Sequence, residues 1–150
     1  GAMESGKPLS IFLLDVDHFK QFNDKFGHQF GDQVLRLIAE VLKNSVRGED
    51  LAARFGGEEL VGVLPGVDIK VAATVAERVR QAIASREVRR RATGEILSSI
   101  TVSVGVAQFA PGETLTSLFD RCDRALYAAK RGGRNRTVTE LELANDSAAA

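Results

Sequence analysis

The sequence predicts an α+β fold, in which helices flank a mostly antiparallel central sheet of about five strands. Apolar patterns of strand and helix period follow one another in mixed order along the chain. Near the middle, Gly56-Gly57 indicates a tight hairpin, because only glycine takes a positive φ without strain. The chain of 150 residues is long enough for one domain with an adequate core.

The composition is that of an ordinary globular protein, with 44% hydrophobic and 27% charged residues. Lysine and arginine together number 20, as do aspartate and glutamate, so we expect neither a nucleic-acid partner nor membrane contact by this domain. No apolar run approaches membrane-spanning length, and no secretory signal pattern is seen. The single cysteine, Cys122, suits a reducing cytoplasm and a packed core. We therefore expect a cytoplasmic domain, although the full-length protein could be membrane-tethered.

The first third of the chain predicts a strand followed by two helices. Residues 1–9 are expected to be an expression scar and a flexible start, after which Ile11–Asp17 forms a strand. A short helix should then end at Gly27, and Asp32 is expected at the N-cap or in the first turn of the next helix. That helix shows apolar side chains at helical spacing: Val34, Leu37, Ile38, Val41 and Leu42.

The middle of the chain predicts the hairpin and a long helix. Leu51–Phe55 and Leu60–Leu64 form the hairpin strands, and Asp68 caps the helix that follows them. The buried stripe of this helix is predicted to contain Val71, Val75, Val79, Ala82 and Ile83. We interpret the arginine-rich stretch at its end as a solvated helix terminus favoured by the dipole: Arg86, Arg89, Arg90 and Arg91.

The last third predicts a central strand, a helix and an edge strand. Ser99–Phe109 alternates apolar and hydroxyl residues, as a central strand does. Thr116 is expected to cap the last helix, which Gly132-Gly133 ends. Thr137–Leu143 reads as an edge strand, and residues 144–150 as a disordered tail, so the folded domain is predicted over residues 10–143. The inward face of the last helix is predicted to contain Leu118, Phe119, Cys122, Ala125, Leu126 and Ala129.

Acidic residues gather at two predicted strand ends. Asp15 and Asp17 close the first strand at positions i and i+2, so both point to the same face. Glu58 and Glu59 open the second hairpin strand. A lone aspartate at a strand end is usually a turn residue, but four acids on two such ends favour a site for a divalent cation.

The two acidic stretches also carry a resemblance. Asp15-Val16-Asp17-His18-Phe19-Lys20, followed by Gly56-Gly57-Glu58-Glu59-Leu60, resembles the GGDEF domain of diguanylate cyclases, from about Ser10 to about Arg136. The resemblance implies a palm-like fold of the ferredoxin-like, nucleotidyl cyclase type. It implies an enzyme that condenses two GTP into cyclic di-GMP and releases pyrophosphate. The family's helix and Asp-x-Leu-Thr-Gly-Leu-x-Asn-Arg segment do not precede the first strand, so we expect a fragment that lacks an N-terminal sensory domain.

A triphosphate cannot lie beside ionised carboxylates unaided, because like charges about 4 Å apart repel by about 4 kcal/mol at an effective dielectric of about 20. A bound Mg²⁺ (or Mn²⁺) reverses that sign. Asp15 and Glu58 are therefore the expected ligands, and the resemblance adds the backbone carbonyl of Val16. Glu59 is either a further ligand or a helper in deprotonation of the attacking hydroxyl. Asp17 either faces the ion or only braces the loop.

Phosphate binding is expected next to these acids. Successive backbone amides of His18, Phe19 and Lys20 could form an anion-binding curve, and Lys20 is also predicted to serve catalysis. The resemblance implies that Lys130 and Arg134 reach the β- and γ-phosphates, whereas a basic helix C-terminus by itself is usually only favourable to the dipole.

Guanine presents both acceptor and donor edges, which an amide and a carboxylate can match. Asn23 and Asp32 correspond to the family's base-reading pair, although a turn former and a helix cap are the ordinary roles of these residues. His18 and His28 have no matched metal-ligand partner, so both are interpreted as structural.

The resemblance also implies an inhibitory site for the product, formed by Arg47 and Asp50 with help from Arg78. Because one site binds one GTP, catalysis is expected to need a homodimer. The alternative is a catalytically idle module that senses cyclic di-GMP or GTP, which Leu60 in place of the family's phenylalanine mildly favours. Another nucleotidyl cyclase is disfavoured by Asp32. Leu60 is expected to point into apolar packing, where the change from phenylalanine is tolerated.

Overall fold

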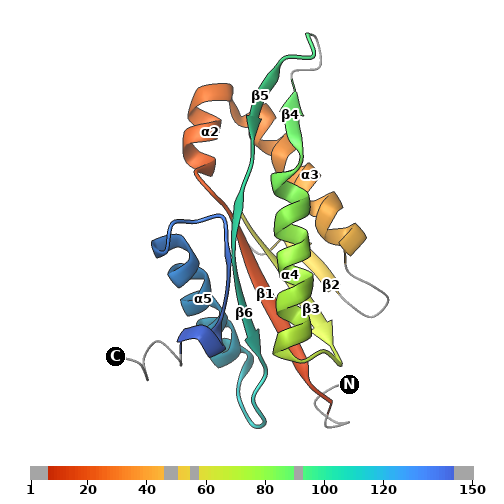
Figure 1. Cartoon of the computed structure of the whole chain (residues 1–150), viewed down its shortest axis with the longest axis vertical. Coiled ribbons are helices and arrows are strands. Elements are labelled where there is room, and N and C mark those ends of the chain that lie inside the picture. The colour runs from red at the N-terminus through yellow and green to blue at the C-terminus, as the bar shows by residue number, and fades with distance from the viewer. Residues whose placement is uncertain (1–6, 46–50, 55–57, 90–92, 144–150) are drawn as a thin grey trace.

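The computed structural model describes residues 7–45, 51–54, 58–89 and 93–143, and it has a central sheet in the order β2-β3-β1-β6-β7 (Figure 1). Antiparallel pairing joins the first four strands, and the short β7 lies parallel to β6. The α+β class with a mostly antiparallel sheet is therefore confirmed. The strands of this sheet are β1 (Leu9–Val16), β2 (Leu51–Arg54), β3 (Glu59–Pro65), β6 (Val102–Gln108) and β7 (Thr137–Thr139).

Helices cover both faces of the sheet, and β1 contributes to the core on each side. Phe12, Leu14 and Val16 belong to the larger core beneath α2 (Phe19–Phe26), α3 (His28–Ser45) and α4 (Ile69–Ala84). Ile11 and Leu13 belong to the smaller core beneath α5 (Leu115–Arg131). The strand is thus buried on both faces, as its continuous apolar run requires. None of the helices in the described ranges is long and apolar enough to cross a membrane.

The alternation along β1 places Asp15 on the face that α5 covers. Its register partners are Glu59 on β3 and Ser103 on β6. Residues directly opposite each other in antiparallel strands share a face. One end of the sheet therefore carries a polar group of side chains next to the C-terminal end of α5.

Contact between α5 and β6 is close enough to involve backbone atoms. A Cβ built on Gly105 would lie 2.5 Å from the carbonyl oxygen of Cys122 and 2.8 Å from Cα of Leu126. The Cys122 thiol is fully buried 3.2 Å from the carbonyl of Gly105, and burial raises the pKa of this thiol to about 12. Cys122 is a core thiol, as predicted.

Helix ends that depend on local signals are mostly as predicted. Gly27 follows the end of α2, Gly132 follows α5, and Asp68 caps α4 by accepting a 2.9 Å hydrogen bond from the amide of Val71. The prediction for Thr116 is wrong: Thr114 caps α5, and its hydroxyl accepts from the amide of Ser117 at 3.1 Å.

Asp32 is not a cap either, because α3 begins at His28, directly after Gly27, and Asp32 lies in its second turn. The predicted apolar face of α3 is confirmed for Val34, Ile38, Val41 and Leu42, while Leu37 is half-buried.

The buried stripe of α4 differs from the prediction. Val71 is 51% exposed, and Val75 and Ala82 are only half-buried. The helix instead turns its small alanines, Ala72 and Ala76, toward the core, which allows it to pack close to the sheet. The buried residues of α4 are Ile69, Ala72, Ala76, Val79 and Ile83.

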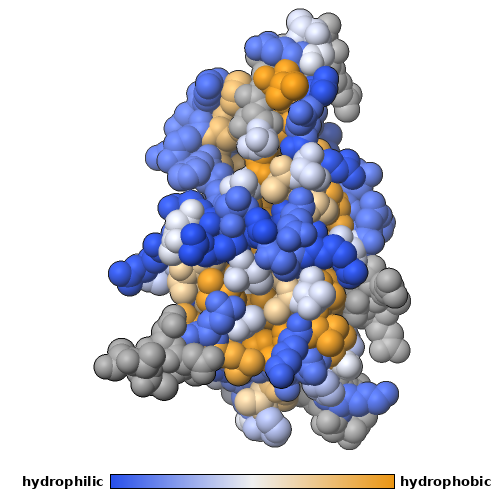
Figure 2. Space-filling model, viewed as in Figure 1, coloured by the Kyte–Doolittle hydropathy of each residue, from blue (hydrophilic) through white to orange (hydrophobic). Residues whose placement is uncertain are grey.

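On the face in Figure 2, hydrophilic side chains form a band across the middle and hydrophobic ones gather toward the lower end.

The arginine-rich stretch does not end a helix. α4 stops at Ala84, and β4 (Glu87–Arg89) pairs with β5 (Ile96–Ser99) in a separate hairpin at the top of Figure 1. Arg89 is paired with Glu87 at 2.7 Å within this hairpin, while Arg90 and Arg91 lie outside the described residues.

The predicted strand Ser99–Phe109 is also divided into β5 and β6. The break falls at Thr101, whose carbonyl accepts from the amide of Asp17 at 3.0 Å and whose hydroxyl donates to the Asp17 carboxylate.

The predicted edge strand Thr137–Leu143 is wrong in its second half. β7 ends at Thr139, and residues 140–143 are helical. Thr139 and Glu142 form a capping box, in which the backbone amide of each donates to the side chain of the other at 3.3 Å. Glu140 is paired with Arg121 of α5, which fixes this turn against the domain.

Predictions on residues 1–6 and 144–150, on the turn Gly56-Gly57 and on the last residue of the first hairpin strand, Phe55, fall outside the described residues.

We predict that Gly105→Ala lowers the free energy of unfolding by about 3 kcal/mol, because the added methyl group meets backbone atoms that cannot move aside. Urea unfolding followed by circular dichroism measures the change. Gly112→Ala is the control: it adds a methyl group that meets no atom of the described residues within 4 Å, at a φ of 80° that costs about 1 kcal/mol. Equal losses in the two variants would contradict the prediction.

We also predict that acid weakens the fold through Glu113. Its hydrogen bonds with Arg121 lower the pKa of this carboxyl from 4.5 to about 2. Between those values the unfolded chain binds more protons than the folded one, so the stability from Glu113 is complete above pH 4.5 and is lost as the pH falls toward 2. Glu113→Gln should flatten the dependence of unfolding free energy on pH in this window. If the free energy of unfolding depends on pH in the same way in the variant and the wild type, the prediction is wrong.

Candidate active site

Carboxylates from two neighbouring strands meet where β1 ends and β3 begins. Asp15 and Glu59 are directly opposed in the register, and the amide of Val16 donates to the carbonyl of Glu58 at 3.4 Å. The structure therefore brings the acids of the two strand ends together, as the sequence predicts.

Asp15 is the most deeply buried of these acids, with 4% of its surface exposed. Its Oδ2 is paired with the ammonium group of Lys130, which projects from the last turn of α5. Its Oδ1 is buried and has no hydrogen-bond partner among the residues that the structure describes. One oxygen of Asp15 is thus neutralised from the α5 side, and the other is not engaged by a donor of the described residues.

The two glutamates experience the charge of Asp15. Partial burial and the negative charge of Asp15 raise the pKa of both Glu58 and Glu59, and Lys130 partly offsets this effect. The exposed Asp123 on α5 raises the pKa of Glu59 further. Three carboxylates therefore repel one another at this point, which is the electrostatic situation that a bound cation relieves.

Asp17 braces the loop, which is one of the two roles that the sequence left open. Its carboxylate accepts from the hydroxyl groups of Thr101 at 2.7 Å and Ser103 at 2.6 Å. It also accepts from the amide of Asn135 at 3.0 Å. Sequence reasoning missed these three partners, and the alternating hydroxyls of the predicted central strand were the available signal. Both oxygens of Asp17 are thus engaged within the protein.

Two tight loops flank this brace. His18 at the start of α2 and Arg134 and Asn135 after α5 have left-handed backbones, with φ of 56°, 63° and 46°. Non-glycine residues adopt this conformation only where their surroundings enforce it. A left-handed residue followed by helical ones turns successive amides toward one side, as in anion-binding nests.

A small cavity of about 160 Å³ lies between the two loops. It brings together the expected metal ligands and the expected phosphate-binding residues. Its lining comprises Asp15, Val16, Asp17, His18, Phe19, Lys20, Gln21, Glu58, Lys130 and Arg134.

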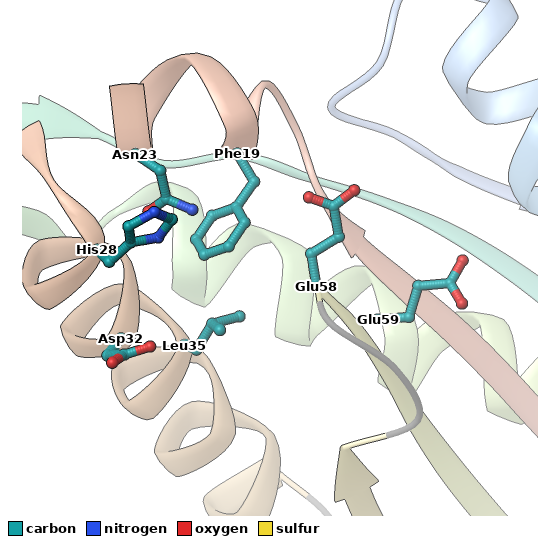
Figure 3. Close-up of a pocket in the computed structure, with 7 residues that line it drawn as sticks. All are labelled: Phe19, Asn23, His28, Asp32, Leu35, Glu58 and Glu59. Atoms are coloured by element: carbon teal, nitrogen blue, oxygen red, sulfur yellow. The ribbon is translucent and has the colours of Figure 1, made fainter. Parts of the chain in front are cut away.

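A larger cavity of about 480 Å³ adjoins it between α2, α3 and the start of β3 (Figure 3). Asn23 and Asp32, the expected guanine-binding pair, both line it, and Glu58 and Glu59 lie on its opposite side. Phe19 and Leu35 add apolar walls that the sequence analysis did not assign to the site. His28, interpreted from the sequence as structural, is exposed and lines this cavity beside Asn23.

Leu60 points away from Glu59 into the larger core, as predicted, and only 3% of its surface is exposed. It also forms part of the wall of a third cavity of about 330 Å³, together with Leu35 and Arg36 of α3. Leucine at this position preserves an apolar contact between β3 and the helix that carries Asp32.

The expected inhibitory site is described only in part. Arg47 and Asp50 lie outside the described residues, while Arg78 is exposed on α4. Within the part of the chain that the structure describes, no three His, Cys, Asp or Glu side chains form a ready-made metal centre. Any ion at Asp15 and Glu58 would therefore also need backbone, water or nucleotide oxygens as ligands.

Comparison with known proteins agrees with this geometry. Residues 2–136 match the family model described as "Diguanylate cyclase, GGDEF domain". Diguanylate cyclase VdcA of Vibrio cholerae is 42% identical over 136 residues, which cover 91% of this chain and 40% of the relative. Diguanylate cyclase DgcP of Pseudomonas aeruginosa is 46% identical over 131 residues, covering 87% of this chain and 19% of the relative.

Solved structures give the same result. The GGDEF domain of DgcB from Caulobacter crescentus, in complex with c-di-GMP, superposes with a TM-score of 0.89 at 47% identity, covering 93% of this chain and 81% of that one. The active GGEEF domain of a diguanylate cyclase from Vibrio cholerae gives a TM-score of 0.83 at 34% identity, covering 93% and 86%. The chain spans less than half the length of the curated relatives above, but it covers most of these domains. It belongs to the GGDEF-domain family of diguanylate cyclases.

Proposed function

We propose that the chain is a diguanylate cyclase that condenses two GTP into cyclic di-GMP, with Mg²⁺ or Mn²⁺ as cofactor. The observation that carries the proposal is the convergence of Asp15, Glu58 and Glu59 where the two cavities meet. Asp15 and Glu58 line the smaller cavity, and Glu58 and Glu59 line the larger one together with Asn23 and Asp32. The relatives named as diguanylate cyclases support the same activity.

Guanine would occupy the larger cavity. The exposed carboxylate of Asp32 can accept from N1–H and the exocyclic amino group of the base, and the amide of Asn23 complements a further edge. Adenine offers no such pair of donors to a carboxylate. Phe19 and Leu35 would cover the faces of the base, because apolar walls with a few placed polar groups are typical of ligand pockets.

The acidic group fits a divalent cation. Its donors are carboxylate oxygens, which Mg²⁺ prefers, and within the described part of the chain Oδ1 of Asp15 is buried without a hydrogen-bond partner. Asp15, Glu58 and the carbonyl of Val16 would hold the ion. When bound, it would stabilise the negative charge that develops at the reacting phosphate. Lys130, which is paired with Asp15 in this structure, could donate to a phosphate oxygen if the charge of Asp15 were balanced by the ion.

Phosphates would lie in the smaller cavity. The amides of His18, Phe19 and Lys20 follow the left-handed turn at His18, and Lys20 and Arg134 add positive charge to the same lining. Asp17 keeps the two loops at a fixed separation, so that donors from both can contact one triphosphate.

In the reaction, the 3′-oxygen of one GTP forms a bond to the α-phosphorus of the other, and the bond to pyrophosphate breaks. The hydroxyl proton needs an acceptor, and Glu59 is either that base or a further ligand. A raised pKa suits Glu59 to accept a proton. Because the guanine cavity described above holds one GTP, two copies of the chain would face each other for both bonds to form.

Product inhibition through Arg47, Asp50 and Arg78 is part of the proposal. Exposed arginine on α4 offers a planar donor fork that suits guanine edges and phosphates. The DgcB domain, which shares the fold at 47% identity, has been solved with c-di-GMP.

Incubation with GTP and Mg²⁺ tests the proposal, with nucleotides separated by chromatography. We expect cyclic di-GMP and pyrophosphate, at a rate that rises faster than linearly with protein concentration because the active species is a dimer. A protein that binds cyclic di-GMP in calorimetry but turns over no GTP at high concentration would instead be a sensing module.

Asp15→Asn and Glu58→Gln should each lower the rate by about 100-fold or more, because each removes a charge that holds the ion while nearly preserving shape. Asp120→Asn, on the exposed face of α5, is the matched control and should keep the wild-type rate. Rates are compared at saturating GTP, with circular dichroism to verify folding. Undiminished product formation in both site variants would rule out these ligands.

A further inference from the structure

We infer that Gly31 is a positioning residue for guanine recognition, because the absence of its side chain leaves the space that the Asn23 amide occupies. The inference rests on the proposed function, in which Asn23 contacts the base. Gly31 itself touches no substrate.

The contact between the two residues leaves no room for a methyl group. A Cβ built on Gly31 would lie 2.8 Å from Cγ and 3.2 Å from Nδ2 of Asn23, and closer still to Oδ1. Real Cβ atoms essentially never approach another heavy atom to less than 3.0 Å. Any larger residue at position 31 therefore displaces the Asn23 side chain from its present place.

The backbone at Gly31 does not explain the glycine. Gly31 lies inside the regular helix α3, is buried, and is not among the glycines with a positive φ. Its amide donates to the carbonyl of Gly27 at 3.2 Å, as any helical residue could. Glycine inside a helix is less favourable than alanine, so its presence here indicates a need for space.

Packing is what holds the Asn23 side chain. The backbone of Asn23 is fixed, because its carbonyl accepts from the amide of Gly27 at 2.7 Å. Its Oδ1, however, is buried and receives no hydrogen bond from the described residues. The close surface of Gly31 on α3 therefore determines where the amide lies on the cavity wall, beside Phe19 and His28 (Figure 3).

A methyl group at position 31 would act on the site and leave the fold intact. The atoms that it meets belong to the end of a flexible side chain at a cavity wall. At Gly105, by contrast, an added Cβ meets the backbone of α5. Gly31→Ala can therefore separate positioning of Asn23 from folding.

Calorimetric titration of four proteins with a non-hydrolysable GTP analogue and Mg²⁺ tests the inference. The proteins are the wild type, Asn23→Ala, Gly31→Ala and the double variant. We expect each single variant to bind about tenfold more weakly, the effect of losing about one hydrogen bond to the base. The double variant should bind no more weakly than Asn23→Ala, because both changes remove the same contact.

Two controls separate positioning from general damage. Gln29→Ala, an exposed change in the first turn of the same helix, should keep wild-type affinity and melting temperature. The matching ATP analogue should bind the wild type and Gly31→Ala alike, so that preference for guanine falls while binding of the triphosphate does not.

Gly31→Ala with wild-type affinity, while Asn23→Ala is weakened, would overturn this inference alone. Additive losses in the double variant would also overturn it, because Gly31 would then act independently of Asn23. If Asn23→Ala binds the GTP analogue as tightly as the wild type, Asn23 does not contact the base, and the inference is overturned. A wild-type protein that binds no guanine nucleotide would overturn the proposed function as well.

Discussion

The buried carboxylate of Asp15 is the charge on which the arrangement of this site depends. It is buried because β1 packs into a core on each face, and the strand's alternation directs residue 15 toward α5. The strand register then sets Glu59 directly opposite it, and the end of α5 supplies Lys130 as its partner. Removing water from a carboxylate is costly unless a positive charge compensates for it. The fold thus creates a demand for positive charge at one place, and both the lysine and a divalent cation can meet it.

Asp17, two residues further on, holds two loops in place through hydrogen bonds, whereas Asp15 contributes negative charge to the site. The hydrogen bonds of Asp17 join the loop after β1 to the start of β6 and to the loop after α5. Both loops contain left-handed residues, and a fixed anchor between them keeps that conformation in place. A substitution of Asp15 and a substitution of Asp17 would therefore have different effects, although both residues lie at the end of the same strand.

Local signals in the sequence predicted what local interactions decide. Gly27, Asp68 and Gly132 mark helix ends because a cap depends on residues within one turn. The alternation of β1 and the pairing of acids at two strand ends were also legible from the sequence. The spacing of Thr139 and Glu142 also fits a capping box, but the same residues show the alternation of a strand, and the strand was predicted. The sequence did not predict that α4 buries its alanines, because this helix has two apolar stripes and tertiary packing determines which one is buried. Nor did it predict the partners of Asp17, which lie at least 84 positions away along the chain.

The two buried glycines, Gly105 and Gly31, have different roles, because one contacts backbone atoms and the other contacts a side chain. Gly105 meets backbone of a packed helix, so its role belongs to the fold and would persist in a protein without any ligand. Gly31 meets a side-chain amide on a cavity wall, and nothing in the backbone of α3 requires it. Glycine is less favourable than alanine inside a helix, and the space that it leaves at position 31 is filled by the Asn23 amide at the wall of the larger cavity. Asp15 and Asn23, whose Oδ1 atoms have no hydrogen-bond partner among the described residues, both line cavities of the candidate site, whereas Thr137, with an equally unpaired hydroxyl, lines neither of these two cavities. An unpaired buried polar atom therefore points to a ligand only where a cavity wall lies beside it.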